Sequence, residues 1–325
     1  MTEKILDVCN LKTHFYTRRG VVKAVDGVSF SLNRGETLGL VGESGCGKTI
    51  TSLSILRLVP KPAGRIVGGE IIFDGEDLVA KSEKEMESYR GKRISMILQD
   101  PMTSLNPVFT IGDQVAEPIK QHQKLKGPAL WERVKEMLKL VRIPAPEIRI
   151  HDYPHQMSGG MRQRVVGAVG LSCQPYLLIA DEPTTSLDVT IQSQYLRLLK
   201  EIQQKSMLSM IFITHDLGIV ARVCDRVAVM YAGKIVESAG VRDLFNRPQH
   251  PYTVALLKSL PKLEVRTNRL FAIGGQPPSL IDFAGGCAFA PRCEHTDDKC
   301  RQEYPPQTTI EGREHLVSCW HSNGK

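Results

Sequence analysis

The stretch Gly42-Glu43-Ser44-Gly45-Cys46-Gly47-Lys48-Thr49 has the spacing G-x-x-x-x-G-K-[ST], which is the pattern of a phosphate-binding P-loop. The apolar run Thr37–Val41 before it predicts a short buried strand, and the Leu- and Ile-rich run 50–59 after it predicts a helix. In that setting the glycines let backbone N–H groups converge on phosphate oxygens, and the helix N-terminus adds partial positive charge. The stretch therefore predicts an α/β fold that binds a nucleotide, with Lys48 on the β and γ phosphates and the Thr49 hydroxyl on Mg²⁺.

The composition is that of an ordinary globular protein, with 325 residues, 42% hydrophobic and 24% charged. We find no apolar run of about 18 residues, and residues 1–10 contain acidic residues without a long apolar core. The sequence therefore predicts neither a membrane span nor a signal peptide, and we expect the protein in the cytoplasm. The net charge of +7 suits a nucleotide or a nearby anionic lipid surface without requiring nucleic acid.

The order of the predicted elements indicates a mostly parallel sheet covered by helices on both faces. Residues 111–141 are predicted to be helical, and the Pro- and Gly-rich segment 60–69 is predicted to be a loop. Strands are predicted at 5–15, 21–32, 70–78, 93–98, 176–180 and 209–214, with a hairpin at 226–238. We therefore divide the chain into an α/β core of residues 1–99 and 174–245, a helical insertion of residues 100–173, and a small cysteine-rich C-terminal extension of residues 246–325.

A second acidic motif follows one of the predicted strands. Leu177-Leu178-Ile179-Ala180-Asp181-Glu182 is an apolar run that ends in two acids, which is the Walker B form. In this form Asp181 orients Mg²⁺, and Glu182 polarises the attacking water as general base. Solvated acids at a strand end are the alternative interpretation, and the presence of the P-loop argues against it.

A third motif, Ser158-Gly159-Gly160, places a hydroxyl and two glycines before a predicted helix. This arrangement predicts a second anion site at a helix N-terminus. Because one P-loop serves one nucleotide, such a site would cap the γ-phosphate of ATP bound to another subunit. An ordinary Ser-Gly-Gly helix cap is the alternative.

These motifs, with Gln99, Ser186-Leu187-Asp188 and His215, occur in the order found in an ABC transporter ATPase subunit, which residues 4–260 resemble. The resemblance implies a P-loop NTPase fold with a RecA-like core, an antiparallel β subdomain and the helical insertion as signature subdomain. It also implies ATP hydrolysis coupled to transport, with Mg²⁺ held by Thr49, Gln99 and Asp181.

Further roles are carried over from this family by position. Gln99 corresponds to the glutamine that contacts Mg²⁺ or the lytic water and links to the transmembrane partner. Asp188 corresponds to the aspartate that signals across the ATPase dimer, and His215 to the histidine that contacts the γ-phosphate. Adenine in this family stacks on an early aromatic residue, for which Phe15 aligns best and Tyr16 is the alternative.

Two runs resemble the oligopeptide/dipeptide importer subfamily: Gln99-Asp100-Pro101-Met102-Thr103-Ser104-Leu105-Asn106-Pro107 and His250-Pro251-Tyr252-Thr253. The resemblance implies a peripheral protein at the cytoplasmic face of the cell membrane. Its expected partners are a second ATPase subunit (the same chain or a sister chain), two transmembrane permease subunits and, indirectly, an extracytoplasmic solute-binding protein, with no nucleic acid. Di- or oligopeptides are the expected cargo, while relatives carry nickel, oligosaccharides or other solutes.

Four of the eight cysteines gather near the C-terminus: Cys287, Cys293, Cys300 and Cys319. Their spacing lacks the C-x₂₋₄-C pairs that are usual in zinc sites, although four thiolates can hold an iron–sulfur cluster. The subfamily resemblance implies a [4Fe–4S] cluster on these cysteines with a structural role. Zinc, and free thiols or a disulfide, are the alternatives.

Two functions from other classes are alternatives to that of an importer ATPase. A soluble ABC ATPase of DNA repair or translation typically carries paired cassettes, coiled coils or zinc modules, whereas this sequence has one P-loop and no predicted coiled coil. A purely regulatory ATP binder would not need the acid at Glu182 or the histidine at His215.

Overall fold

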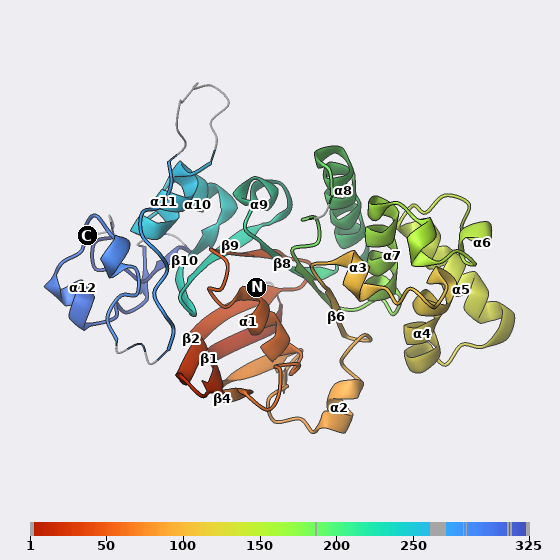
Figure 1. Cartoon of the computed structure of the whole chain (residues 1–325), viewed down its shortest axis with the longest axis horizontal. Coiled ribbons are helices and arrows are strands. Elements are labelled where there is room, and N and C mark those ends of the chain that lie inside the picture. Colours follow the sequence, from red (N-terminus) through yellow and green to blue (C-terminus); the bar gives the residue numbers. More distant parts are fainter. Residues whose placement is uncertain are drawn as a thin grey trace. The chain divides into compact units, whose positions relative to one another are not determined.

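The computed structural model describes residues 3–185, 187–260, 271–281, 283, 285–310, 312 and 314–322. The chain forms two compact units, and Figure 1 labels most of their helices and strands. The first unit comprises Met1–Ile5, Leu32–Thr37 and Ala80–Ile213. The second comprises Leu6–Ser31, Leu38–Val79 and Thr214–Lys325. Each unit is described by itself below.

The first unit contributes three parallel strands: β6 (Ile94–Ile97), β7 (Leu177–Asp181) and β8 (Ser209–Thr214). Strand β7 lies in the middle and pairs with β6 on one side and β8 on the other. Every residue of β7 and β8 is buried, as expected for continuous apolar runs in a covered parallel sheet. This arrangement places the carboxyl end of β7, where the two acids follow, at one edge of the sheet.

Helices α4 (Ile111–Gln123), α5 (Gly127–Leu140), α7 (Gly159–Leu171) and α8 (Val189–Ser206) make up most of the rest of this unit. The helical prediction for 111–141 is confirmed apart from a break between α4 and α5, where Lys124 takes a left-handed conformation that ends α4. The apolar face predicted for the second half of that range is confirmed, since Leu130, Val134, Met137, Leu138 and Val141 are all buried. The shorter helices are α2 (Glu83–Glu87), α3 (Pro101–Ser104), α6 (Pro146–Arg149) and the 3-10 helix η1 (Pro154–Gln156).

The second unit contains an antiparallel sheet in the order β2-β1-β4-β5. Its strands are β1 (Lys4–Thr17), β2 (Gly20–Asn33), β4 (Gly64–Phe73) and β5 (Glu76–Asp77). The loop predicted over 60–69 is therefore wrong from Gly64 onward. Pairing with β1 overrides the low strand propensity of glycine, and Gly64 leaves room for the Phe15 ring, since an added Cβ would lie 2.8 Å from Phe15 Cε1.

A second sheet of this unit runs from the P-loop strand to the C-terminal region. Strand β3 (Thr37–Val41) is parallel to β9 (Arg226–Tyr231), which forms a hairpin with β10 (Lys234–Gly240). Strand β12 (Leu316–Val317) then pairs with β10 and with β11 (Thr308–Thr309). Residues close to the C-terminus thus extend the sheet that carries the P-loop.

The helices of the second unit are mostly short. Helix α1 follows the P-loop and ends at residue 55, four residues before the predicted end of the helical run. The helices are α1 (Lys48–Ile55), α9 (Leu217–Val223), α10 (Val241–Asn246), α11 (Pro251–Lys258), α12 (Asp298–Gln302) and the 3-10 helix η2 (Ala290–Arg292). Within the described parts of the chain, no helix has both the length and the apolar character that a membrane span requires.

A buried carboxylate on β10 holds two segments of the C-terminal extension (residues 246–325), one near its start and one near its end. Glu237 is 0% exposed and accepts hydrogen bonds from the backbone N–H groups of Gln249 and His250 at 2.7 and 2.9 Å. Its Oε1 also lies 2.7 Å from Nε2 of the buried His315. Because a buried charge is tolerated only with such partners, Glu237 holds segments 12 to 78 residues away in the chain.

The buried His250 side chain is held in its neutral form. Its Nδ1 accepts a hydrogen bond from the Tyr252 N–H at 3.0 Å and so caps α11, which leaves the ring proton on Nε2. Burial disfavours the imidazolium and lowers the pKa of His250 to about 4. The unfolded chain, with an ordinary histidine pKa near 6.5, therefore binds a proton that the folded chain does not take up between about pH 6.5 and pH 4.

We predict that His250 makes the fold sensitive to acid. As the pH falls from about 6.5 to 4, protonation of the unfolded state should lower the free energy of unfolding by at most about 3 kcal/mol, at 1.36 kcal/mol per pKa unit. Urea unfolding at pH 7 and pH 5 measures the loss. His250→Asn, whose side chain can also cap a helix, should lose less stability between these two pH values than the wild type. An equal loss in both proteins would show that His250 is not the responsible group.

Candidate functional site

The residues singled out by their motifs fall into both units. Gln99, the Ser158–Gly160 motif, Asp181, Glu182 and Asp188 belong to the first unit. Phe15, the P-loop, His215 and the four C-terminal cysteines belong to the second. Ser186, which precedes Asp188 in its motif, lies outside the described residues.

The P-loop has the strand–loop–helix setting that its sequence predicts. Strand β3 leads into Gly42, and Gly47 is the N-cap of α1 with φ +107°. Gly42 has φ +152°, and a Cβ added there would lie 2.2 Å from Met230 O, while one added at Gly47 would lie 2.3 Å from Ala24 O. Both the backbone conformation and the lack of space require glycine, so the loop shape is fixed by its neighbours.

Lys48 lies folded into the loop. It is 6% exposed, and its Nζ donates to the carbonyl oxygens of Gly42 and Glu43 at 2.8 and 3.0 Å. Its ammonium group thus lies at the N-terminus of α1, and the exposed Thr49 is the next residue of the helix. Burial raises the pKa of the Cys46 thiol, which keeps this loop residue uncharged. The arrangement offers cationic and N–H groups to an anion.

The exposed tip of the P-loop is formed by Ser44 and Gly45. Gly45 has φ +79°, and an added Cβ would have nothing within 4 Å. The tip therefore faces open space, which an incoming phosphate chain requires.

The two aromatic candidates for adenine stacking differ in their surroundings. Phe15 is half-buried on β1, with its ring against Gly64 of β4. Tyr16 is 48% exposed, and the Arg65 guanidinium lies 5.4 Å from its ring centroid. One ring face of Tyr16 is therefore engaged in a cation–π contact. The assignment of Phe15 to the adenine stays a prediction.

The two acids after β7 have distinct environments. Asp181 is 4% exposed at the end of the strand. Glu182 takes a left-handed conformation with φ +45°, and its N–H donates to Ile213 O at 2.9 Å. A non-glycine residue in this region stores strain, and such residues concentrate at functional sites.

The structure brings Gln99 and Glu182 together, although 83 residues separate them in the chain. Gln99 Nε2 donates to Glu182 Oε2 at 3.0 Å, and Thr185 Oγ1 donates to the same oxygen at 3.0 Å. Two donors therefore orient one carboxylate oxygen. Gln99 was predicted from the sequence as a site residue, whereas Thr185 was not.

Ser158 and Asp188 both cap helices of the first unit. The Ser158 hydroxyl accepts from Met161 N at 3.3 Å at the start of the 13-residue helix α7. One carboxylate oxygen of Asp188 accepts from Thr190 N and Ile191 N at 3.1 and 3.0 Å at the start of α8. Gly160 lets α7 approach α8, because an added Cβ would lie 2.6 Å from Ile191 Cγ2. These caps are compatible with the predicted roles in phosphate contact and signalling, which stay predictions.

His215 is exposed and follows β8 directly, in the turn that precedes α9. Asp216, the next residue, caps α9 through its carboxylate, which accepts from Gly218 N at 2.7 Å. The exposed position leaves the imidazole accessible to a ligand.

The four C-terminal cysteines lie within electrostatic reach of one another. Burial raises the pKa of Cys319 to about 11, with smaller contributions from the charges of the other three. Burial also raises the pKa of Cys287, Cys293 and Cys300. Backbone N–H groups point at two of the sulfurs, from His295 to Cys293 and from His321 to Cys319, each at 3.4 Å. None of the four forms a disulfide.

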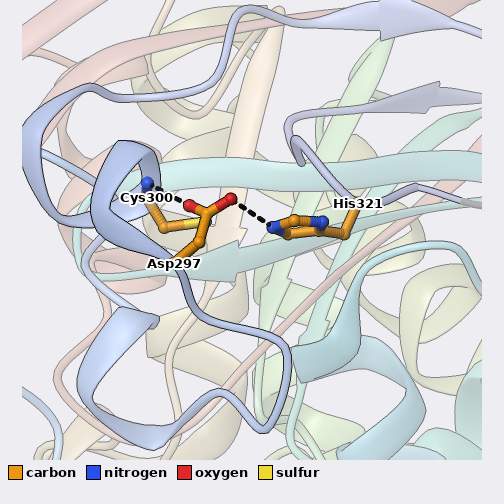
Figure 2. A group of neighbouring side chains, drawn as sticks. All are labelled: Asp297, Cys300 and His321. Carbon is orange, nitrogen blue, oxygen red and sulfur yellow. Dashed lines mark hydrogen bonds and ion pairs between the residues drawn. The ribbon is translucent and has the colours of Figure 1, made fainter.

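Figure 2 shows a neighbouring group that the sequence analysis did not identify: Asp297, Cys300 and His321. Asp297 accepts from Cys300 N at 2.8 Å as the cap of α12, and it lies 3.0 Å from His321 Nε2. Potential ligand atoms of the three residues lie within 4.8 Å of one another. Asp297 and His321 can thus supply ligand atoms beside the Cys300 sulfur.

Comparison with known families and structures identifies the chain's relatives. The family model described as ABC transporter matches residues 25–185, and the model described as oligopeptide/dipeptide transporter, C-terminal region, matches residues 236–300. The structure of cbiO1 from Clostridium perfringens, part of an ABC transporter complex, is 27% identical with a TM-score of 0.64 and covers 75% of this chain and 91% of that one. The ATP-binding cassette MJ0796 bound to ADP and Pi, 23% identical with a TM-score of 0.66 over 73% of this chain and 99% of that one, shares the fold.

Two Bacillus subtilis proteins match nearly the whole chain. The dipeptide transport ATP-binding protein DppD is 53% identical over 98% of this chain and 95% of its own length. The oligopeptide transport ATP-binding protein OppD is 51% identical over 98% of this chain and 88% of its own length. At this identity and coverage the chain is an ATPase that belongs to the ATP-binding proteins of the ABC transporter family, with the C-terminal region of the oligopeptide/dipeptide branch.

Proposed function

We propose that this chain hydrolyses ATP to drive the import of di- or oligopeptides through a membrane permease. The observation that carries the proposal is the match of the whole chain, including the C-terminal region at 236–300, to dipeptide and oligopeptide transport ATP-binding proteins. The identity extends beyond the ATPase motifs that all ABC proteins share. The peptide cargo therefore has support that the P-loop alone would not give.

The P-loop residues 42–49 bind the phosphates of ATP in this proposal, with Lys48 on the β and γ phosphates and the adenine on Phe15. Thr49, Gln99 and Asp181 would hold Mg²⁺, which neutralises charge on the β and γ phosphates when it is bound. The hydroxyl, amide and carboxylate donor set fits this ion, because Mg²⁺ prefers oxygen ligands.

Glu182 acts as the general base in this proposal. Gln99 and Thr185 each donate to its Oε2 at 3.0 Å, which orients the carboxylate to accept a proton from water. The exposed His215 contacts the γ-phosphate.

Two ATPase subunits form the working assembly. The solved structure of MJ0796 with ADP and Pi is described as dimeric. We infer that Ser158, Gly159 and Gly160 of one subunit cap the γ-phosphate of ATP held by the other, because the start of α7 offers N–H groups and the positive end of a helix. Asp188 signals across this interface. The second subunit is a copy of this chain or a sister chain.

The permease would dock on a hollow of the first unit. Residues next to Gln99 line this hollow of about 1040 Å³ on the helical side of the unit, among them Leu98, Leu105 and Phe109. Leu98 and Phe109 are 47% and 53% exposed, so apolar side chains are available for a partner. Docking there would tie the permease to the glutamine that orients Glu182 and would hold the chain at the membrane.

We infer that the four C-terminal cysteines hold a [4Fe–4S] cluster. The four thiols are close enough to influence one another's pKa, and backbone N–H groups point at two sulfurs, as thiolate ligands require. Because burial raises all four pKa values, binding would release protons from the thiols. Cys287, Cys293, Cys300 and Cys319 would hold the cluster, and their shared ligation would cross-link residues 287–300 to Cys319, which is a structural contribution.

We predict that Glu182→Gln binds ATP and hydrolyses it at least about 100-fold more slowly, since a general base contributes that much or more. Phosphate release by the purified chain, alone and with its partner subunits, measures the rate. Glu132→Gln, which removes an exposed carboxylate from α5 in the same unit, is the matched control and should keep the wild-type rate. Turnover by Glu182→Gln close to that of wild type would remove Glu182 from this role.

We predict that anaerobically purified protein contains about four iron and four acid-labile sulfide per chain, as a [4Fe–4S] cluster requires. Cys287→Ser, Cys293→Ser, Cys300→Ser and Cys319→Ser should each lose iron and lower the melting temperature. Cys9→Ser, which changes an exposed cysteine of β1, should keep both. Zinc in place of iron, or four serine variants that match wild type in metal content and melting, would contradict the cluster.

A further inference from the structure

Arg292 of the C-terminal region is a charged side chain buried against the P-loop within the second unit. It is 4% exposed, and its Nη1 and Nη2 atoms donate to the two oxygens of the Glu43 carboxylate at 2.8 and 3.0 Å. Its Nε donates to Gly274 O at 2.8 Å, and Nη1 also donates to the Tyr231 hydroxyl at 3.1 Å. These contacts fix the planar guanidinium in one orientation.

Glu43 is held through its backbone as well. Its N–H donates to the hydroxyl of the fully buried Tyr252 at 2.9 Å, and its carbonyl accepts from Lys48 Nζ at 3.0 Å. The Tyr252 ring packs on that of Tyr231, with 4.6 Å between centroids. Arg292, Tyr252 and Lys48 therefore fix Glu43. Of these three, Arg292 and Tyr252 lie outside the ATPase motifs of the sequence.

The charge of Glu43 poses a problem in a loop that binds phosphates. A carboxylate there repels an incoming polyanion unless a cation compensates it, and Lys48 is needed by the phosphates themselves. The two-point pairing with Arg292 supplies that compensation and fixes the orientation of the carboxylate, because both of its oxygens accept from the guanidinium.

We propose that Arg292 is a positioning residue of the nucleotide site, which neutralises and orients Glu43 and so keeps the P-loop in a shape that accepts phosphates. The proposal rests on the assignment of residues 42–49 as the phosphate-binding loop. Arg292 ends the 3-10 helix η2 and immediately precedes Cys293, so the fold of the C-terminal region sets its place. That region is then part of the ATPase site.

The test is the affinity for MgADP, measured by calorimetry on the full-length purified protein. Arg292→Gln should weaken binding by about tenfold or more, which corresponds to about 1.4 kcal/mol. Adding Glu43→Gln to Arg292→Gln removes the uncompensated carboxylate and should restore the affinity to within about threefold of wild type. High salt should narrow the gap between Arg292→Gln and wild type, because it screens the repulsion.

Two controls separate this proposal from its basis. Lys48→Ala should abolish MgADP binding, whereas Arg242→Gln, which removes an exposed positive charge from α10 in the same unit, should leave it unchanged. Unchanged affinity in Arg292→Gln, with Lys48→Ala inactive, overturns the role of Arg292 alone. A wild-type protein that does not bind MgADP overturns the P-loop assignment and this proposal with it.

A purely structural role for Arg292 predicts a different pattern. Arg292→Gln would then lower the melting temperature and the metal content, and the second substitution at Glu43 would not restore affinity, which overturns the proposal. Should Arg292→Gln fail to fold, Arg292→Lys carries the test, since it keeps the charge and loses the two-point pairing. We expect it to weaken MgADP binding by about two- to fivefold, less than the glutamine variant. Unchanged binding there also overturns the proposal.

Discussion

The tight packing of the P-loop backbone is the constraint on which the second unit depends. Gly42 and Gly47 lie so close to Met230 O and Ala24 O that no side chain fits at either position. Neighbouring strands therefore set the shape of the loop. Strand β9, which is parallel to β3, lies on one side and strand β2 lies on the other. In the proposed function, a loop held in this way presents its N–H groups to phosphate without reorganising on binding, which is how fixed dipoles contribute most to binding and catalysis.

The C-terminal region is joined to this loop by buried polar contacts. Glu237 ties segments on both sides of α11 to β10, and Arg292 and Tyr252 reach from the same region to Glu43. Buried ion pairs are costly to break because removal of one partner leaves a desolvated charge. They favour one arrangement over others, so that the extension has a defined place beside the loop. In the proposed transporter, the cysteine group and the nucleotide site would then be parts of one folded unit.

Local patterns in the sequence predicted much of the fold, because apolar runs, glycines and acids at fixed spacing report on their own backbone. The P-loop setting and the buried strands are of this kind. The break at Lys124 and the strand from Gly64 were missed, since a left-handed cap and pairing with β1 depend on neighbours. The family resemblance predicted that Gln99 contacts Mg²⁺ or the lytic water, whereas its hydrogen bond to Glu182 and the contacts of Thr185 and Arg292 were found only in the folded chain. Side chains far apart in sequence meet through the fold, which no local pattern records.

We infer that the strands and the C-terminal region jointly fix the shape of the P-loop. Hydrogen exchange with and without MgADP tests this inference most directly. We expect slow exchange of the Glu43 amide before nucleotide is added, because this N–H donates to the buried Tyr252 hydroxyl. On addition of MgADP, protection should increase over 44–50 and extend to 289–293. Protection confined to residues outside 42–50, or a Glu43 amide that exchanges as fast as an unfolded one, would contradict it.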